Sequence, residues 1–123
     1  MEFENKVVWI TGASSGIGEH LAYALAEHKA KLILSSRNEK ELQRVKDNCP
    51  EGTDILVLPL DVSDFDSIPA AVVKAVASFG NIHILINNAG VSQRSLIKDT
   101  TFDVDHKIMS INYLGTVAMT KAV

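Results

Sequence analysis

Short runs of aliphatic residues alternate with longer amphipathic segments along the whole chain, and this alternation restricts the fold most. Four runs, at 7–10, 32–34, 55–58 and 82–86, are apolar at almost every position. Such runs are typical of parallel strands that are buried on both faces. The segments between them are long enough to form crossover helices. The pattern therefore predicts an α/β fold with a doubly wound parallel sheet.

The amphipathic segments indicate which residues of each helix face the sheet. Asn38, with Glu41 three residues on, predicts a capped helix start, and a last helix is expected from about Thr101. Helical spacing predicts these inner faces: Ile17, Leu21, Ala24 and Leu25; Leu42 and Val45; Val72, Val73 and Val76; Val104, Ile108, Ile111, Gly115 and Ala118. We also expect Ile108, Ile111 and Met119 to be exposed on the last helix.

A glycine-rich turn, Thr11–Gly18, joins the first strand to the first helix. Gly12 permits a tight turn, Gly16 lets the backbone approach a phosphate, and Gly18 lets the helix pack near the sheet. Exposed N–H groups at the helix start would bind phosphate, helped by the helix dipole. The alternative is a glycine turn without a ligand. No Gly-Lys-Ser/Thr follows, which excludes a kinase-type phosphate loop.

Four ordered motifs, spread from Lys6 to the last residue, together resemble the short-chain dehydrogenases/reductases. They are the turn Thr11–Gly18, Asp61-Val62, Asn87-Asn88-Ala89-Gly90, and Asn112 within Ile111-Asn112-Tyr113. Ser92–Ser95 and Asp103–Asp105 are most similar to the branch called member-7-type dehydrogenase/reductases. The resemblance implies a Rossmann-like domain over residues 1–123, with three αβα layers and the first four strands in the order 3-2-1-4.

The resemblance also assigns roles to residues at the ends of the strands. It implies a cofactor site made of Gly12, Ser14, Ser15, Gly16, Ile17, Gly18, Ser36, Arg37, Asp61, Val62, Asn88, Ala89 and Gly90. Asp61 would touch the adenine amino group and Val62 its ring, although a helix-capping aspartate fits the sequence too. Asn88 to Gly90 would line the nicotinamide ribose, or form an ordinary turn. Asn112 matches the catalytic asparagine, although a solvated asparagine fits as well.

Arg37 follows the second strand, where NAD enzymes usually offer a carboxylate to the ribose 2′-hydroxyl. Its guanidinium would instead form a charge-assisted contact with a 2′-phosphate, so NADP is the expected cofactor. The alternative is a solvated surface arginine.

The implied function is NADP(H)-dependent hydride transfer between a carbonyl and an alcohol of a small molecule. Similar enzymes carry a serine and a Tyr-x-x-x-Lys pair roughly 25 to 45 residues past the asparagine. We expect the chain to stop before these residues and to be inactive alone, because Tyr23 and Tyr113 lack a lysine four residues on. One alternative is a non-catalytic NADP(H)-binding module. A methyltransferase, the other, is disfavoured because Arg37 replaces the acidic residue it needs.

Composition narrows the remaining possibilities. Hydrophobic residues make up 46% and charged residues 22% of the 123 residues, as in soluble globular proteins. The net charge of −3 gives no reason to expect nucleic acid or an anionic membrane as partner. A single cysteine, Cys49, charged residues within Met1–Lys6 and four scattered histidines predict no internal disulfide, no secretory signal and no metal site. We expect a cytoplasmic protein and, from the resemblance, a homo-oligomer.

Overall fold

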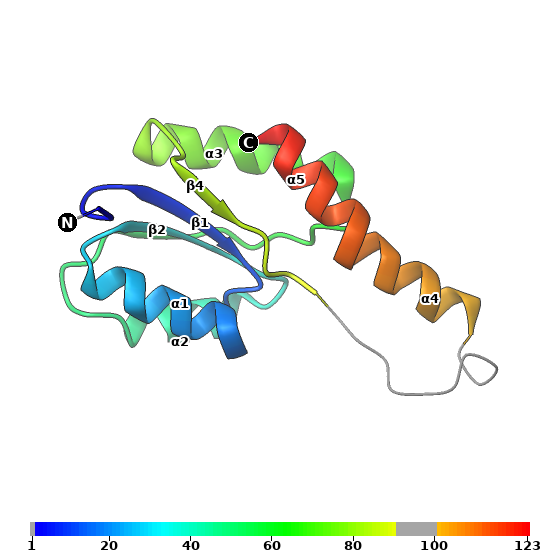
Figure 1. The fold of residues 1–123 in the computed structure, drawn as a ribbon, viewed down its shortest axis with the longest axis horizontal. Coiled ribbons are helices and arrows are strands. Elements are labelled where there is room, and N and C mark those ends of the chain that lie inside the picture. The colour runs from blue at the N-terminus through cyan, green and yellow to red at the C-terminus, as the bar shows by residue number, and fades with distance from the viewer. Residues whose placement is uncertain (1, 91–100) are drawn as a thin grey trace.

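The computed structural model describes residues 2–90 and 101–123 and contains a four-stranded parallel sheet (Figure 1). Its strands are β1 (Val7–Thr11), β2 (Lys31–Ser35), β3 (Ile55–Val57) and β4 (Ile84–Ile86). They lie in the order β3-β2-β1-β4, which confirms the predicted topology. Ser92–Ser95, on which the similarity to the member-7 branch partly depends, lies outside the described residues.

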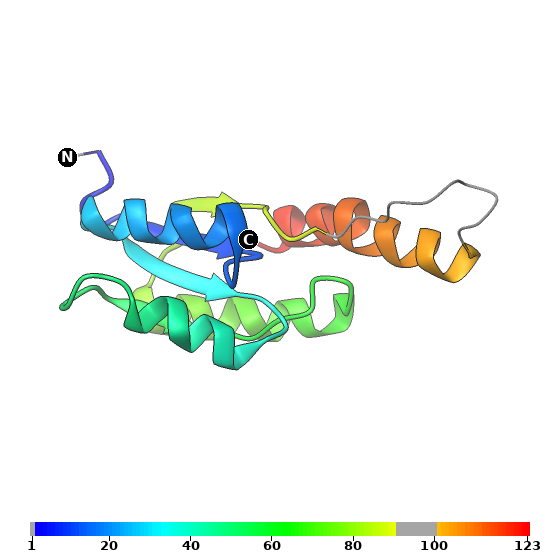
Figure 2. The same cartoon turned by 90° about the horizontal axis from the view of Figure 1, so that it is seen from below.

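Helices cover both faces of the sheet, so the molecule has the predicted three layers (Figures 1 and 2). One face carries α1 (Gly16–Glu27) and α2 (Glu39–Asp47), and the other carries α3 (Ile68–Phe79) and α5 (Thr116–Ala122). A 3-10 turn (Phe65–Ser67) precedes α3. The helix α4 (Phe102–Met109) extends beyond the carboxyl ends of the strands (Figure 1).

Successive side chains of β1 point to opposite faces of the sheet, which explains why every position of this strand is apolar. Val8 and Ile10 pack with α1 and α2, whereas Val7 and Trp9 pack with α3 and α5. All four are at most 2% exposed. A central parallel strand is therefore buried on both sides, as its sequence predicts.

The fourth strand is shorter than the predicted 82–86, because a side chain replaces the main chain in the ladder at His83. The Val7 N–H donates to His83 Nδ1 at 2.9 Å, and the His83 N–H donates to the Val7 carbonyl at 3.0 Å. The strand proper begins at Ile84.

The predicted inner face of α3 is partly wrong. Ile68, Ala71 and Ala75 are buried, whereas Val73 and Val76 are 68% and 43% exposed. Val72 packs against the core only in part. Small alanines let the helix approach the sheet closely, but their weak hydrophobic signal does not stand out beside the valines.

The predicted inner face of α1 is also partly wrong, because small residues form much of the buried face. Gly18, Ala22, Leu25 and Ala26 are its buried residues, while Ile17 is 72% exposed. The predicted capping of α2 is confirmed, since Asn38 Oδ1 accepts from the Glu41 N–H at 3.2 Å.

The last helical region departs from the predicted single amphipathic helix in two respects. A π-helical segment, Ser110–Gly115, separates α4 from α5. The expected exposure of Ile111 and Met119 is wrong, because they are 5% and 0% exposed within the core that contains Ile68 and Ala75. This region packs on α3, and its apolar side chains cover Val7 and Trp9. Ile111 and Met119 are therefore buried because α3 is the neighbour that the sequence did not reveal.

Candidate functional site

Two glycines of the turn between β1 and α1 are needed because protein backbone lies against them. A Cβ at Gly12 would lie 2.7 Å from the Asn88 carbonyl oxygen, and one at Gly18 would lie 2.2 Å from the Gly12 carbonyl oxygen. Any larger residue would push α1 away from β1 and from the segment after β4. The predicted roles of a tight turn and close helix packing agree with this geometry.

Gly16 differs from these two, because the space beside it is open. Among the described residues, no atom lies within 4 Å of the position its Cβ would take, and its φ is +55°. Ser15, Gly16 and Ile17 are exposed in succession. Ser15 is the N-cap of α1, yet its side chain makes no capping hydrogen bond. The start of α1 is therefore exposed and has no side-chain cap, and helix starts of this kind can bind phosphate through their first N–H groups.

The segment after β4 is tied to this turn through Thr11, the last residue of β1. Its hydroxyl oxygen accepts from the N–H groups of Asn88 and Ala89, both at 3.1 Å. The Asn88 side chain donates from Nδ2 to the Gly12 carbonyl at 3.1 Å. Asn88 thus fixes the glycine turn from the neighbouring strand. Thr11 belongs to the Thr11–Gly18 motif, but the sequence assigned it no role, because its only signal is a hydroxyl at the end of an otherwise apolar strand.

The end of β2 places Ser36 and Arg37 beside the same region. Ser35 is buried, and its hydroxyl accepts from the indole N–H of Trp9 at 2.8 Å. Ser36 Oγ accepts from the Asn38 N–H at 3.1 Å, so this serine shapes the start of α2. Arg37 is exposed, and within residues 2–90 and 101–123 its guanidinium makes no hydrogen bond or ion pair. Its donors are available to an anion.

Asp61 forms a turn of its own after β3. Its Oδ1 accepts from the Ser63 N–H at 2.9 Å and from the Ser63 hydroxyl at 2.6 Å. Partial burial raises the pKa of Asp61, but the Ser63 hydrogen bonds and the charges of Arg37 and Lys107 outweigh it and hold that pKa below its ordinary value. A capping-type role is thus present, although the aspartate caps its own turn and not α3.

Val62 and Asn112 lie where the last helical region approaches the strand ends. A Cβ on Gly115 would lie 2.7 Å from Val62 Cγ2, so this glycine allows the close contact. A Cβ on Gly90 would lie 3.3 Å from Asn112 Oδ1, which places the Asn112 side chain beside the end of the segment after β4.

Asn112 lies in the π-helical segment, a feature that often marks functional sites. The Thr116 hydroxyl donates to the Asn112 main-chain carbonyl at 3.3 Å. Asn112 is therefore held by local backbone geometry, and its residue type only hints at this departure from an α-helix.

A cleft unites the carboxyl ends of the four strands. It is lined by Thr11, Gly12, Ser35, Arg37, Leu60, Asp61, Val62, Ala89, Gly90 and Ile111. Five predicted regions of the chain thus meet at one place. The remaining predicted residues, Ser14, Ser15, Gly16, Ile17, Gly18, Ser36, Asn88 and Asn112, do not line this cleft.

The part of the chain that the structure describes contains neither a candidate metal site nor a membrane-spanning helix. No three His, Cys, Asp or Glu side chains there are grouped so that they could bind a metal ion. None of the described helices has the length and apolar character needed to cross a membrane.

The sequence pattern of the short chain dehydrogenase family matches residues 6–123. Human dehydrogenase/reductase SDR family member 7 is 53% identical over 127 residues, which cover 99% of this chain and 38% of that protein. The chain thus spans well under half the length of this relative.

Solved structures agree with this match. A short chain dehydrogenase/reductase from Burkholderia phymatum in complex with NAD superposes with a TM-score of 0.94 at 30% identity, covering 99% of this chain and 44% of that one. The 3-ketoacyl-(acyl-carrier-protein) reductase from Brucella melitensis complexed with NADH gives 0.90 at 32%, covering 97% and 48%. The sheet order, the glycine turn and these matches place the chain in the short-chain dehydrogenase/reductase family.

Proposed function

We propose that the chain provides the cofactor-binding part of an NADP(H)-dependent oxidoreductase that interconverts alcohols and carbonyls of small molecules. Family membership supports the oxidoreductase class. Two structural relatives hold NAD or NADH, which supports a nicotinamide cofactor. The 2′-phosphate preference rests on Arg37 and is the more specific part of the proposal.

The residues present fit a dinucleotide. The open space at Gly16 and the uncapped start of α1 suit a pyrophosphate, because main-chain N–H groups and the helix dipole both favour anions there. The cleft beyond it carries Asp61 and Val62 on one side, where an adenine would lie, and Ala89 and Gly90 on the other. We assign the nicotinamide ribose to the side of Asn88, Ala89 and Gly90.

The observation that carries the NADP preference is the exposed Arg37 at the rim of the cleft, which makes no hydrogen bond or ion pair with residues 2–90 and 101–123. A guanidinium bound to a phosphate contributes about 1.5–3 kcal/mol, which corresponds to about tenfold to hundredfold in affinity. No carboxylate occupies the end of β2, Ser35-Ser36-Arg37, to receive a ribose 2′-hydroxyl.

When bound, the cofactor would accept or supply a hydride at its nicotinamide ring. The chain's own contribution to the reaction is Asn112, whose main-chain carbonyl would hold a water in a proton relay. This carbonyl belongs to the π-helical segment, and the lack of a side chain at Gly90 leaves room for the Asn112 side chain. A tyrosine acting as general acid is not assigned within this chain. The Tyr23 hydroxyl donates to Glu19 at 2.6 Å, and burial, followed by Glu19, raises its pKa.

Homo-oligomerisation forms part of the proposal, and the apolar surface of the last helical region supports it. Phe102, Met109 and Tyr113 are 79%, 54% and 58% exposed on α4 and the segment after it. Sedimentation equilibrium of the protein with Met109→Glu, compared with the unmutated protein, tests whether this surface mediates association.

Calorimetric titration of NADPH and NADH against the protein at its full natural length tests the cofactor assignment. We expect NADPH to bind about tenfold to hundredfold more tightly, and Arg37→Asp to reverse the preference. Lys121→Asp makes the same charge change at an exposed position of α5 and should leave the ratio unchanged. Equal affinities in the unmutated protein would refute the role of Arg37.

A further inference from the structure

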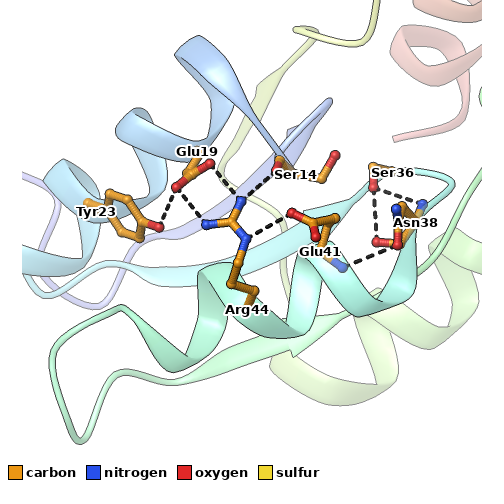
Figure 3. A network of polar contacts seen from close by, with 7 residues as sticks. All are labelled: Ser14, Glu19, Tyr23, Ser36, Asn38, Glu41 and Arg44. Carbon is orange, nitrogen blue, oxygen red and sulfur yellow. Dashed lines mark hydrogen bonds and ion pairs between the residues drawn. The ribbon is translucent and has the colours of Figure 1, made fainter.

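Arg44, on the last turn of α2, forms a clamp between α2, α1 and the glycine turn (Figure 3). Its Nη1 and Nη2 donate to the two carboxylate oxygens of Glu19 at 3.0 and 2.9 Å. Nη2 also donates to the Ser14 main-chain carbonyl at 3.1 Å, and Nε donates to Glu41 at 2.8 Å. One guanidinium thus uses three of its nitrogens on two helices and one loop.

The contact with Ser14 fixes the direction of a peptide group in the phosphate-binding turn. In a trans peptide, the carbonyl of one residue and the N–H of the next point in opposite directions. Because the Ser14 carbonyl points to Arg44, the Ser15 N–H points away from α2. This N–H immediately precedes Gly16, where the space beside the backbone is open. Arg44 therefore orients a donor that it does not touch.

The contact with Glu19 has an electrostatic consequence. Glu19 lies in the first turn of α1, close to where a pyrophosphate would bind. Glu19 is anionic at neutral pH, and hydrogen bonds from Arg44 and then Tyr23 stabilise this charge and lower the pKa of Glu19 to about 2. An uncompensated carboxylate there would repel a bound phosphate. The fork of Arg44 compensates it in place, with the two-oxygen geometry that lysine cannot reproduce.

We propose that Arg44 is a positioning residue for the phosphate-binding turn, which raises affinity for the pyrophosphate of a dinucleotide without contacting it. The inference rests on the proposed cofactor function. This role differs from the proposed cofactor contacts, because Arg44 does not line the cleft. A sequence pattern cannot reveal it, since 25 and 30 residues separate Arg44 from its partners on α1 and in the turn.

Two ligands that share the adenosine 2′-phosphate but differ in the pyrophosphate test this role in the full-length protein. NADPH reaches the turn, whereas adenosine 2′-monophosphate does not. Arg44→Gln should weaken NADPH by about threefold to tenfold and leave adenosine 2′-monophosphate within about twofold. Arg44→Lys, which keeps the charge but loses the fork, should give an intermediate value. Gln43→Ala removes the neighbouring Gln43–Asp47 hydrogen bond on α2 and should change neither affinity.

The outcomes separate the two proposals. Unchanged NADPH affinity in Arg44→Gln, or an equal loss for both ligands, would overturn the positioning role, since an equal loss indicates general damage to the fold. Far-UV circular dichroism and the thermal midpoint of each variant report such damage directly. If the unmutated protein bound neither ligand, the proposed function would fail, and the role of Arg44 would fail with it.

Discussion

Replacing Gly16 by valine separates the role of the turn in folding from its role in binding. Gly16 has a φ of +55°, a conformation that costs an L-residue about 1–2 kcal/mol, so the variant should lose that much stability. The free energy of unfolding of typical domains is about 5–15 kcal/mol, so the variant should remain folded. A branched side chain would then fill the space in which backbone N–H groups meet a phosphate. Losing such charge-assisted hydrogen bonds costs about 1.5–3 kcal/mol, or about tenfold to hundredfold in affinity.

Gly52 provides a matched control for this experiment. Its φ is +88°, and among the described residues no atom lies within 4 Å of its would-be Cβ. It belongs to the loop between α2 and β3, away from the turn. Gly52→Val should therefore lose similar stability in urea unfolding while binding NADPH normally. If Gly16→Val is as stable as Gly52→Val and binds NADPH equally well, the turn at Gly16 does not hold the phosphate.

Two further predictions concern the core and the clamp. Met119→Ala should lower the free energy of unfolding by about 2–5 kcal/mol, because Met119 is 0% exposed. Val73→Ala, at a 68% exposed position on α3, should cost less than about 0.5 kcal/mol, and equal losses in urea unfolding would contradict the packing of α5. Glu19 has a folded pKa of about 2 against an ordinary 4.5, so its stabilising effect is complete above about pH 4.5 and is lost as the pH falls towards 2. Glu19→Gln should flatten the pH dependence of unfolding in that window, and an unchanged pH profile would exclude this contribution.

The sheet was predictable because its information is local and repeated. Every position of Val7–Ile10 is apolar, which is typical of a central strand buried on both faces. The segments between the strands are long enough for crossover helices. The glycine turn was predictable too, since glycine at both Gly12 and Gly18 reflects backbone contacts that no other residue allows.

Helix faces were harder to predict because alanine and glycine carry little hydrophobic signal. Ala71 and Ala75 form the buried face of α3, yet the valines beside them dominate any search for apolar periodicity. Met119 was misplaced for a different reason. Its burial depends on α3, with which the last helical region shares a core, and such a tertiary contact leaves no mark on its own segment.

Side-chain contacts over long separations in the chain were beyond prediction. Glu41 and Arg44 have a spacing that suggests a pair on one helix, and the structure contains it at 2.8 Å. The same guanidinium reaches Glu19 and Ser14 only because α1 and α2 lie on the same face of the sheet. Thr11 likewise gains its partners Asn88 and Ala89 only once β1 and β4 pair.

Amide chemical-shift mapping on the isotopically labelled full-length protein would locate the NADPH-binding site residue by residue. NADPH should shift the amide resonances of residues 12–18, 37, 61–62 and 88–90, at the carboxyl ends of the strands. Residues 51–54, which line a separate pocket formed with 29–31 on the loops that lead into β2 and β3, should keep their positions. Shifts confined to that pocket, or no shifts at saturating NADPH, would contradict binding at the carboxyl ends of the strands.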